Sequence, residues 1–466
     1  MRQEETQAEA ARVFRAAIVA GALIAVGVCI ASWLHRDLTT NDFERFDDLR
    51  LTYAFFVLFT AASAGYVGLV EQPRAAGRRR VLLALIAFAL PLLASFPVGS
   101  RDVFAYAFYP KMWAEYGANP YLRPPSSVAG DPWFPMLQAW WRDHTTAYGP
   151  LFTMQARAVY AVAGRSLAAV VAAHKLLNLP LLLLSGWLLV QLRREITGNS
   201  DDKNENRTLE LWLWCPLVLF ESLGSGHNDL AMTILLQAAV LIWMRGRWFA
   251  AGALLAASFW YKLYSAVFLP VWLIWWMRRS GRATIGQIGG ALAAALVVSA
   301  LAVLPFRAEL GPIIAGLRQH DVARLVFPNE MPPLVWLLFR LLLATGILES
   351  ESGLSVFAAL RLGAFVIGLL WLIVRRGTQI YSASLFVEDC FWSLALFVSV
   401  VPTVLYPWHL LALCPLALAV GGRFYERTAA LITVVGLLSY FLTFVWAVVL
   451  CGLIVGMLAV MRRTPA

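Results

Sequence analysis

The chain has 466 residues, of which 60% are hydrophobic and 14% charged, and its mean hydropathy is +0.68. Soluble domains carry about a quarter charged residues, so this composition excludes an ordinary soluble protein. Apolar runs of bilayer-spanning length recur along the whole chain, for instance at 13–34, 51–70 and 285–304. They predict an all-α, polytopic transmembrane helical bundle of about 11 to 14 spans, formed by residues 1–466 as a single domain.

The net charge of +10 comes from short basic clusters rather than from one extended basic segment. Lysine and arginine collect in the cytoplasmic loops of membrane proteins, so we expect the lipid bilayer and no nucleic acid as a partner. The five cysteines lie in apolar segments without CxxC or Cys–His spacing, which predicts buried thiols. The first apolar run lacks a small-residue cleavage pattern, and we predict that it is retained as a span.

The basic clusters also predict the orientation of the first spans. Arg12 and Arg15 precede the first span and a basic cluster at 74–80 follows the second, whereas the loop 35–50 between them is net acidic. The positive-inside rule then places the N-terminus in the cytoplasm and the loop 35–50 outside. The third span, 81–98, leads back to the outer face.

Three later segments must be irregular if the remaining basic clusters are all cytoplasmic. The segment 248–277 must be a hairpin of two short helices, and the segments near 150–163 and 333–348 must not cross the membrane fully. With this topology, the polar stretch 99–149 lies outside the cell membrane.

The stretch 99–149 is too polar to span the membrane and is dense in Trp, Tyr and Phe. Within it, residues 102–116 place apolar side chains on one face and Asp102, Lys111 and Glu115 elsewhere, which predicts a helix lying in the membrane interface. Long ordered loops are usually functional, so we predict that this external loop carries a function.

Asp102 and the GHND stretch, 226–229, each have two interpretations. Asp102 follows the third span and is a favoured helix N-cap, and a capping position would also hold its carboxylate still for a functional role. Asn228 or Asp229 could cap the apolar helix that follows, but a cap does not require His227 as well. Consecutive polar side chains at a helix N-terminus can hold hydroxyl-rich or anionic groups, which favours a substrate site.

Two lysines interrupt apolar segments. Lys262 lies near the middle of FAAGALLAASFWYKLYSAVFLPVWLIWW, and Lys175 lies within AAHKLLNLP. A lysine facing lipid is costly, so each should face a polar cavity or an anionic partner. The alternative is snorkelling of the side chain to the membrane surface.

An ordered set of motifs resembles the GT-C superfamily of integral-membrane glycosyltransferases: RDVFAYAFYPKMWAEYGANPYLRPP, WWRDHTTAYGP, CPLVLFESLGSGHNDLAM, FWYKLYSAVFLP and YPWHLLALCPLAL. Within it, the chain resembles the polyprenyl-phosphate-mannose-dependent α-mannosyltransferases of bacterial cell envelopes, the MptA/MptB-like group. The resemblance implies a large first external loop with catalytic residues, here 99–149, and a sugar donor carried on a polyprenyl monophosphate. It also implies a catalytic aspartate, which Asp102 matches, and a substrate role for His227, Asn228 and Asp229.

Two positions depart from the family pattern. His409 follows Trp408 where relatives usually have tyrosine, and Lys175 stands where they often have arginine. Both changes bear on how the donor is held.

The residue types suit glycosyl transfer by themselves. Asp102 is expected to act as the general base that takes the acceptor hydroxyl proton in a direct, inverting displacement of a hexose, with mannose the first expectation. Fixed cations would stabilise the leaving phosphate, and aromatic faces would bind the sugar and the first isoprene units. The cations are Lys262, Lys175 and Arg142, with His409 as a further donor to the phosphate, and the aromatic residues are Tyr121, Tyr148 and Trp408. We expect no metal and no other cofactor.

Two other classes of protein compete with this interpretation. A transporter or flippase of a lipid-linked or anionic substrate should show internal repeats or paired broken helices, and it would not need an aromatic outer loop. A structural membrane scaffold leaves Asp102, GHND and Lys262 unexplained. The expected location is a bacterial inner membrane, with the site on the outer face. The sequence leaves three classes of acceptor hydroxyl: a glycan, a glycolipid and a protein.

Overall fold

The computed structural model describes residues 2–34, 49–72, 76–97, 99–279, 285–309, 311–313, 333–349, 351–376, 382–402 and 405–441. Within these ranges the regular elements are all helical, which confirms the predicted all-α class. The α-helices are α1 (Arg2–Leu34), α2 (Leu49–Glu71), α3 (Arg78–Ala94), α4 (Asp102–Tyr116), α5 (Ala139–Arg142), α6 (Pro150–Ala163), α7 (Leu167–Thr197), α8 (Asp202–Leu213), α9 (Pro216–Leu219), α10 (Asp229–Met244), α11 (Trp248–Tyr261), α12 (Leu269–Arg279), α13 (Ile285–Val303), α15 (Pro333–Ala344), α16 (Glu351–Arg376), α17 (Ala383–Val400), α18 (Leu413–Val420) and α19 (Arg423–Leu438). Shorter helical turns are η1 (Pro125–Val128), η2 (Phe134–Met136), η3 (Phe220–Gly224), η4 (Leu263–Phe268), η5 (Leu304–Glu309), η8 (Ile347–Glu349) and η9 (Pro407–Leu410).

Among the described residues, 6 helices are long and apolar enough to cross a membrane, which confirms a multi-pass membrane protein. They comprise Ala16–Leu34, Thr52–Glu71, Leu167–Thr197, Gly286–Phe306, Gly353–Arg376 and Ala383–Val400. Several other apolar helices are shorter, including α10 and α18, so a count of 11 to 14 full spans stays a prediction.

The three segments expected to be irregular do not form full-length spans. Residues 248–277 form two short helices, α11 and α12, separated by the 3-10 turn η4. The helix α6 has 14 residues and α15 has 12, and at a rise of about 1.5 Å per residue neither covers the roughly 30 Å of a hydrocarbon core.

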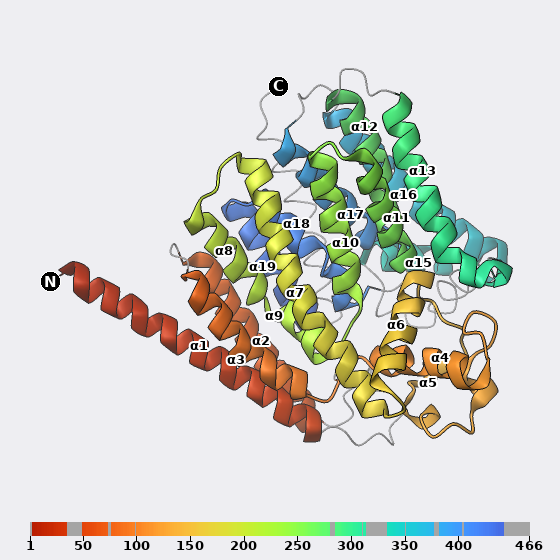
Figure 1. The fold of residues 1–466 in the computed structure, drawn as a ribbon, viewed down its shortest axis with the longest axis horizontal. Helices are drawn as coiled ribbons and strands as arrows, with labels where there is room; N and C mark the ends of the chain where they lie inside the picture. The colour runs from red at the N-terminus through yellow and green to blue at the C-terminus, as the bar shows by residue number, and fades with distance from the viewer. Residues whose placement is uncertain are drawn as a thin grey trace.

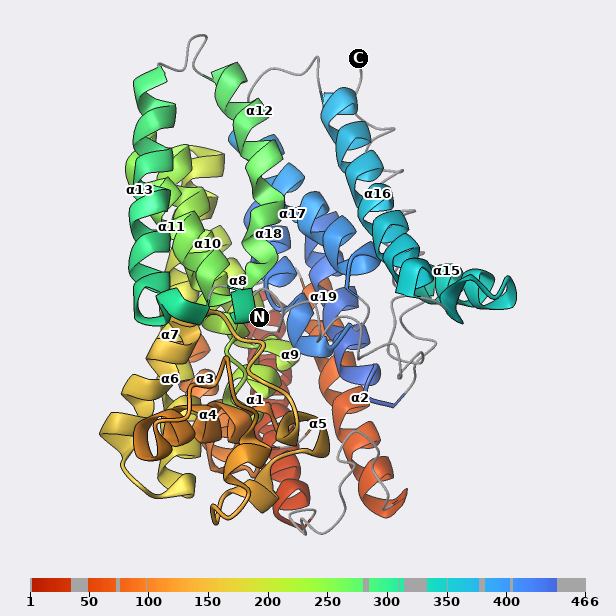
Figure 2. The ribbon, with the colours of Figure 1, turned by 90° about the vertical axis from the view of Figure 1, so that its right-hand side faces the viewer.

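The segment 99–149 gathers at one end of the bundle, where α4, α5 and α6 lie away from α12 (Figures 1 and 2). Helix α4 spans the predicted residues and ends where Gly117 adopts a φ of 61°, the left-handed conformation that favours glycine after a helix. Asp102 through Met112 are all buried within the protein, so the expected polar face is not open to solvent, and a position in the membrane interface stays a prediction. Helices α6 and α7 and the turn η1 pack against α4.

A buried ion pair folds this loop. Lys111 of α4 binds Asp131, whose carboxylate also accepts hydrogen bonds from Tyr116 Oη at 2.8 Å and from the Trp133 backbone N–H at 2.7 Å. Burial raises the pKa of Asp131, but the Lys111 ammonium and these hydrogen bonds outweigh it and hold that pKa below its usual value. The loop is therefore a packed structure rather than a linker.

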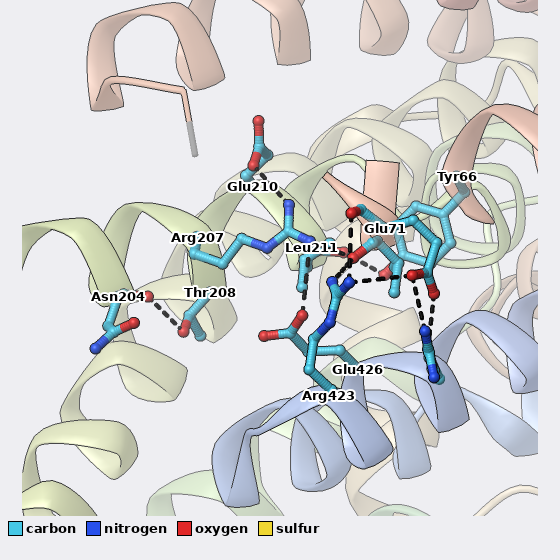
Figure 3. A network of polar contacts seen from close by, with 11 residues as sticks. Tyr66, Glu71, Asn204, Arg207, Thr208, Glu210, Leu211, Arg423 and Glu426 are labelled. Atoms are coloured by element: carbon cyan, nitrogen blue, oxygen red, sulfur yellow. Dashed lines mark hydrogen bonds and ion pairs between the residues drawn. The ribbon is translucent and has the colours of Figure 1, made fainter. Parts of the chain in front are cut away.

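Charged residues tie α2, α8 and α19 together at another place in the bundle (Figure 3). Arg423 of α19 and Arg207 of α8 both donate to the carbonyl of Val70, at 2.7 and 2.8 Å, in the last turn of α2. Glu71 accepts from Arg427 at 2.7 and 2.9 Å. The last carbonyls of a helix have no partner within the helix, and these arginines donate to them. Some of the basic residues therefore have a structural role.

Candidate functional site

The carboxylate of Asp102 points into the protein. Arg101 occupies the N-cap position of α4 and Asp102 is the first residue of the helix, so the capping interpretation of Asp102 is wrong. Its Oδ1 accepts a hydrogen bond from Trp141 Nε1 at 2.9 Å, and its Oδ2 lies 4.0 Å from His227 Nδ1. The side chain of Asp102 therefore faces the GHND stretch, which begins more than a hundred residues later.

The GHND stretch turns sharply before α10. Gly226 has a φ of 80°, and a Cβ there would lie 3.2 Å from both Lys175 Cγ and Val103 Cγ2. Glycine is the residue that adopts this conformation without strain. Asn228 occupies the N-cap position but makes no side-chain cap bond, and Asp229 is the first helical residue. The side chains are thus turned away from capping and toward the site.

Contacts with three other elements fix the position of His227. Its ring stacks on Trp408 with centroids 4.0 Å apart, and its Nδ1 lies 3.5 Å from Tyr106 Oη. The amide of Asn178 donates to the His227 carbonyl at 3.0 Å and so anchors the turn to α7. The Tyr106 hydroxyl also donates to Asn228 Oδ1 at 3.4 Å.

Asp229 and Lys262 form an ion pair. Lys262 Nζ lies 2.6 Å from Asp229 Oδ1, and the side chain of Asp229 is 0% exposed. Lys262 occupies the extended residue between α11 and η4, so the interruption of the apolar segment is also the break between the two helices. The lysine binds a buried carboxylate, and the snorkelling interpretation is wrong.

Close packing against Gly149, the glycine of the YGP motif, positions the segment that carries Lys262. A Cβ on Gly149 would lie 2.0 Å from the carbonyl oxygen of Trp260 and 2.8 Å from that of Tyr261. The last two residues of α11, which directly precede Lys262, therefore lie against Gly149.

We expect Gly149→Ala to lower the free energy of unfolding by about 1–3 kcal/mol, because the added methyl must push the end of α11 away from Gly149. Thermal unfolding in detergent measures the effect. Gly130→Ala is the matched control, since a Cβ there meets nothing within 4 Å. Equal stability of the two variants would contradict this account of Gly149.

Aromatic rings enclose the site next to Asp102. The ring of Tyr106 packs edge-on against Tyr148 at 4.9 Å and Phe152 at 4.8 Å, and Trp141 lies 5.3 Å from Tyr148. Tyr121 supports this wall from behind, since its hydroxyl donates to the Tyr148 carbonyl at 2.9 Å. Tyr148 therefore lies in the site as expected, whereas the hydroxyl of Tyr121 holds the backbone behind it.

Three other predicted site residues have partners outside this cluster. Lys175 is buried on α7, and its ammonium donates to the carbonyl of Ser95 and to its hydroxyl, the latter at 3.3 Å. Arg142 donates to the carbonyls of Leu137 and Pro135, both at 3.0 Å. His409 Nδ1 accepts from the Tyr406 backbone N–H at 3.3 Å.

His409 nevertheless borders the site. Its ring lies edge-on to Tyr264 at 5.4 Å, two residues after Lys262. Of the YPWH motif, Trp408 reaches the site directly, because it stacks on His227 and on Tyr406 at 4.4 Å.

Sequence reasoning missed Glu221, Tyr106, Trp141 and Tyr440. Glu221 Oε2 lies 3.4 Å from His227 Nε2, and Tyr440 donates to Glu221 Oε1 at 2.9 Å. A signal for Glu221 was present, because an acidic residue within the apolar run CPLVLFESL satisfies the same rule that singled out Lys262. The aromatic residues carried no such signal in a chain that is 13% aromatic.

Four buried polar atoms of Glu221 and the GHND stretch have no hydrogen-bond partner among the described residues. They are Glu221 Oε2, His227 Nε2, Asn228 Nδ2 and Asp229 Oδ2. Buried polar groups are nearly always paired, because an unpaired one costs roughly 1–3 kcal/mol. Such a group of atoms, with donors and acceptors side by side, suits a ligand rich in hydroxyl groups.

Fold and site together define a class: a multi-pass helical membrane protein with a buried polar centre beneath a structured loop. Residues 10–278 match the family described as alpha-(1->6)-mannopyranosyltransferase, N-terminal domain, and the chain belongs to this MptA/MptB family. The resemblance seen in the motifs is therefore confirmed. The matched region contains Asp102, the GHND stretch and Lys262, while Trp408 lies beyond it.

Two relatives show the extent of the similarity. The chain is 28% identical over 216 residues to alpha-(1->6)-mannopyranosyltransferase A of Corynebacterium glutamicum, which covers 46% of this chain and 40% of the relative. It is 27% identical over 350 residues to alpha-(1->6)-mannopyranosyltransferase A of Mycobacterium tuberculosis, which covers 71% of this chain and 64% of the relative. Each alignment covers less than two thirds of the relative's own length.

Proposed function

We propose that this protein is a glycosyltransferase that moves mannose from a polyprenyl-phosphate donor to a hydroxyl acceptor on the outer face of the membrane, with inversion. The observation that carries the proposal is the carboxylate of Asp102, held by Trp141 and facing His227 of the GHND stretch. Membership of the mannopyranosyltransferase family supports mannose as the sugar.

Asp102 acts as the general base. Its Oδ2 takes the proton of the acceptor hydroxyl while the acceptor oxygen forms a bond to the anomeric carbon of mannose. The bond between that carbon and the phosphate oxygen breaks, and its electron pair leaves with the phosphate. Because one displacement suffices, one carboxylate is enough and the anomeric configuration inverts.

The sugar hydroxyls bind to the open polar atoms at the start of α10. Asn228 Nδ2 offers a donor and Asp229 Oδ2 an acceptor, and both are buried. A hydroxyl group both donates and accepts, so one sugar can satisfy the two atoms together. The ring of Tyr148 lies beside it, whereas Trp408 is stacked between His227 and Tyr406 and supports the site through His227.

Cations near the site stabilise the leaving phosphate. Lys262 is one, because an ammonium has three donors and Asp229 does not use all of them. Arg101 is another, since it precedes Asp102 and is buried; burial and the charge of Arg142 lower its pKa to about 10, so it stays protonated at neutral pH. A guanidinium group suits a phosphate, because its planar fork of N–H donors matches two phosphate oxygens. The ammonium of Lys175 instead donates to the carbonyl of Ser95.

Transfer assays with the full chain in proteoliposomes test the proposal. We expect radiolabelled mannose to pass from polyprenyl-phosphate-mannose, and not from GDP-mannose, to an acceptor within a panel of glycolipids, lipid-linked glycans and oligomannosides. Movement of intact polyprenyl-phosphate-mannose across the bilayer without any glycosidic product would instead favour the flippase. Transfer from GDP-mannose alone would show that the donor is wrong.

A further inference from the structure

Glu221 is a buried carboxylate behind the candidate base. It lies in η3, a π-helical turn (Phe220–Gly224), and its side chain is 0% exposed. Tyr440 Oη donates to its Oε1 at 2.9 Å, while its Oε2 lies 3.4 Å from His227 Nε2 without an aligned hydrogen bond. One oxygen of Glu221 therefore accepts from Tyr440, just after α19, and the other is directed at the imidazole.

His227 lies between two carboxylates. Its Nδ1 is 4.0 Å from Asp102 Oδ2 and its Nε2 is 3.4 Å from Glu221 Oε2. Stacking on Trp408 fixes the plane of the ring, and the backbone N–H of His227 donates to the Glu221 carbonyl at 2.9 Å. The three side chains thus form a row, Asp102, His227 and Glu221, that reaches from the site into the interior.

A packing role does not account for this row. A buried carboxylate is costly, and one placed only for stability would have both oxygens paired. Glu221 instead leaves one oxygen open toward a histidine whose facing nitrogen is open too. The π-helical turn that places it continues the short helix α9, and π-helical turns are frequent at functional sites. Catalytic hydrogen bonds are often long or misaligned until the substrate binds.

We infer that Glu221 is a positioning residue that acts through His227, an inference that rests on the proposed function. Glu221 accepts the Nε2–H of His227 and so leaves the lone pair of Nδ1 directed at Asp102. After Asp102 takes the acceptor proton, that proton passes from Oδ2 to Nδ1. The imidazolium that forms is paired with the Glu221 carboxylate, and Asp102 is again ionised.

Glu221→Gln separates this role from packing. The amide keeps the size of the side chain, and its oxygen still accepts from Tyr440. Its NH2 group then faces Nε2, which favours the opposite tautomer, with the proton on Nδ1, and removes the charge that stabilises the imidazolium. We expect kcat to fall by about 10²–10⁴-fold with an unchanged KM for polyprenyl-phosphate-mannose.

A double-mutant cycle with His227→Gln provides the decisive measurement. If Glu221 acts through His227, Glu221→Gln lowers kcat in the wild-type background but causes no further loss in the His227→Gln background. The same factor of loss in both backgrounds, or an unchanged kcat in the single variant, would overturn the inference.

Two further variants keep the test sound. Glu210→Gln, a buried glutamate on α8 that accepts from the Ala76 backbone N–H at 3.2 Å, is the matched control and should keep its kcat. If Glu221→Gln does not fold, Tyr440→Phe takes its place in the cycle, with a smaller fall in kcat that must also vanish in the His227→Gln background. Absence of transfer by the wild-type protein would refute the proposed function itself, before the cycle is measured.

Discussion

A purified Asp102→Asn variant should fold and bind its donor but transfer the sugar about 10²–10⁴-fold more slowly than the wild-type protein. Asparagine keeps the shape of the side chain, and its oxygen can still accept the hydrogen bond from Trp141 that Asp102 Oδ1 accepts at 2.9 Å. It cannot take a proton at neutral pH. Because Asp102 makes no capping bond, loss of a helix cap does not complicate the result.

Single-turnover transfer, donor binding and thermal stability, measured on the same preparation, separate these effects. Asp143→Asn, an exposed aspartate of the same loop, removes one negative charge without touching the site and should keep its turnover. If Asp102→Asn turns over at a near-normal rate, Asp102 is not the base, and Asp229 becomes the next candidate.

Lys262→Met should be both less stable and poorer in donor use. Removing the ammonium leaves the fully buried Asp229 carboxylate without its partner at 2.6 Å, and breaking such a pair costs about 3–5 kcal/mol. The variant also loses a cation proposed to bind the donor phosphate, which should raise KM, lower kcat or both.

The Asp229→Asn background distinguishes the two effects. Asparagine there removes the unpaired charge, so Lys262→Met in this background should recover most of the lost stability. A further loss of donor use relative to Asp229→Asn alone then reports phosphate binding by Lys262. Equal kinetics of the single Asp229→Asn and the double variant would show that the ion pair is purely structural.

Features that depend on neighbouring residues were predictable from the sequence. The start of α4 at Asp102, the turn at Gly226 and the break at Lys262 all follow from local chemistry: the end of an apolar run, a glycine and a charge inside an apolar segment. The helical class follows from composition, because a backbone in lipid must satisfy its hydrogen bonds within each segment.

Features that depend on which helices pack together were not predictable in this way. The pattern of 102–116 suits an interfacial helix, yet α6, α7 and η1 pack against α4 and Asp102 through Met112 are buried. Lys175 shows the same limit, since its buried position was expected but its partner, Ser95 at the end of α3, was not.

The sequence by itself determined that this protein is a helical membrane protein and that Asp102, the GHND residues and Lys262 are its unusual polar positions. Only the tertiary structure decided that Glu221, His227 and Asp102 form a row, and that Tyr440 and Trp408 hold it in place. The reason is physical: composition and periodicity record the environment of each segment. The distance between two side chains far apart in the chain depends on how the helices between them pack.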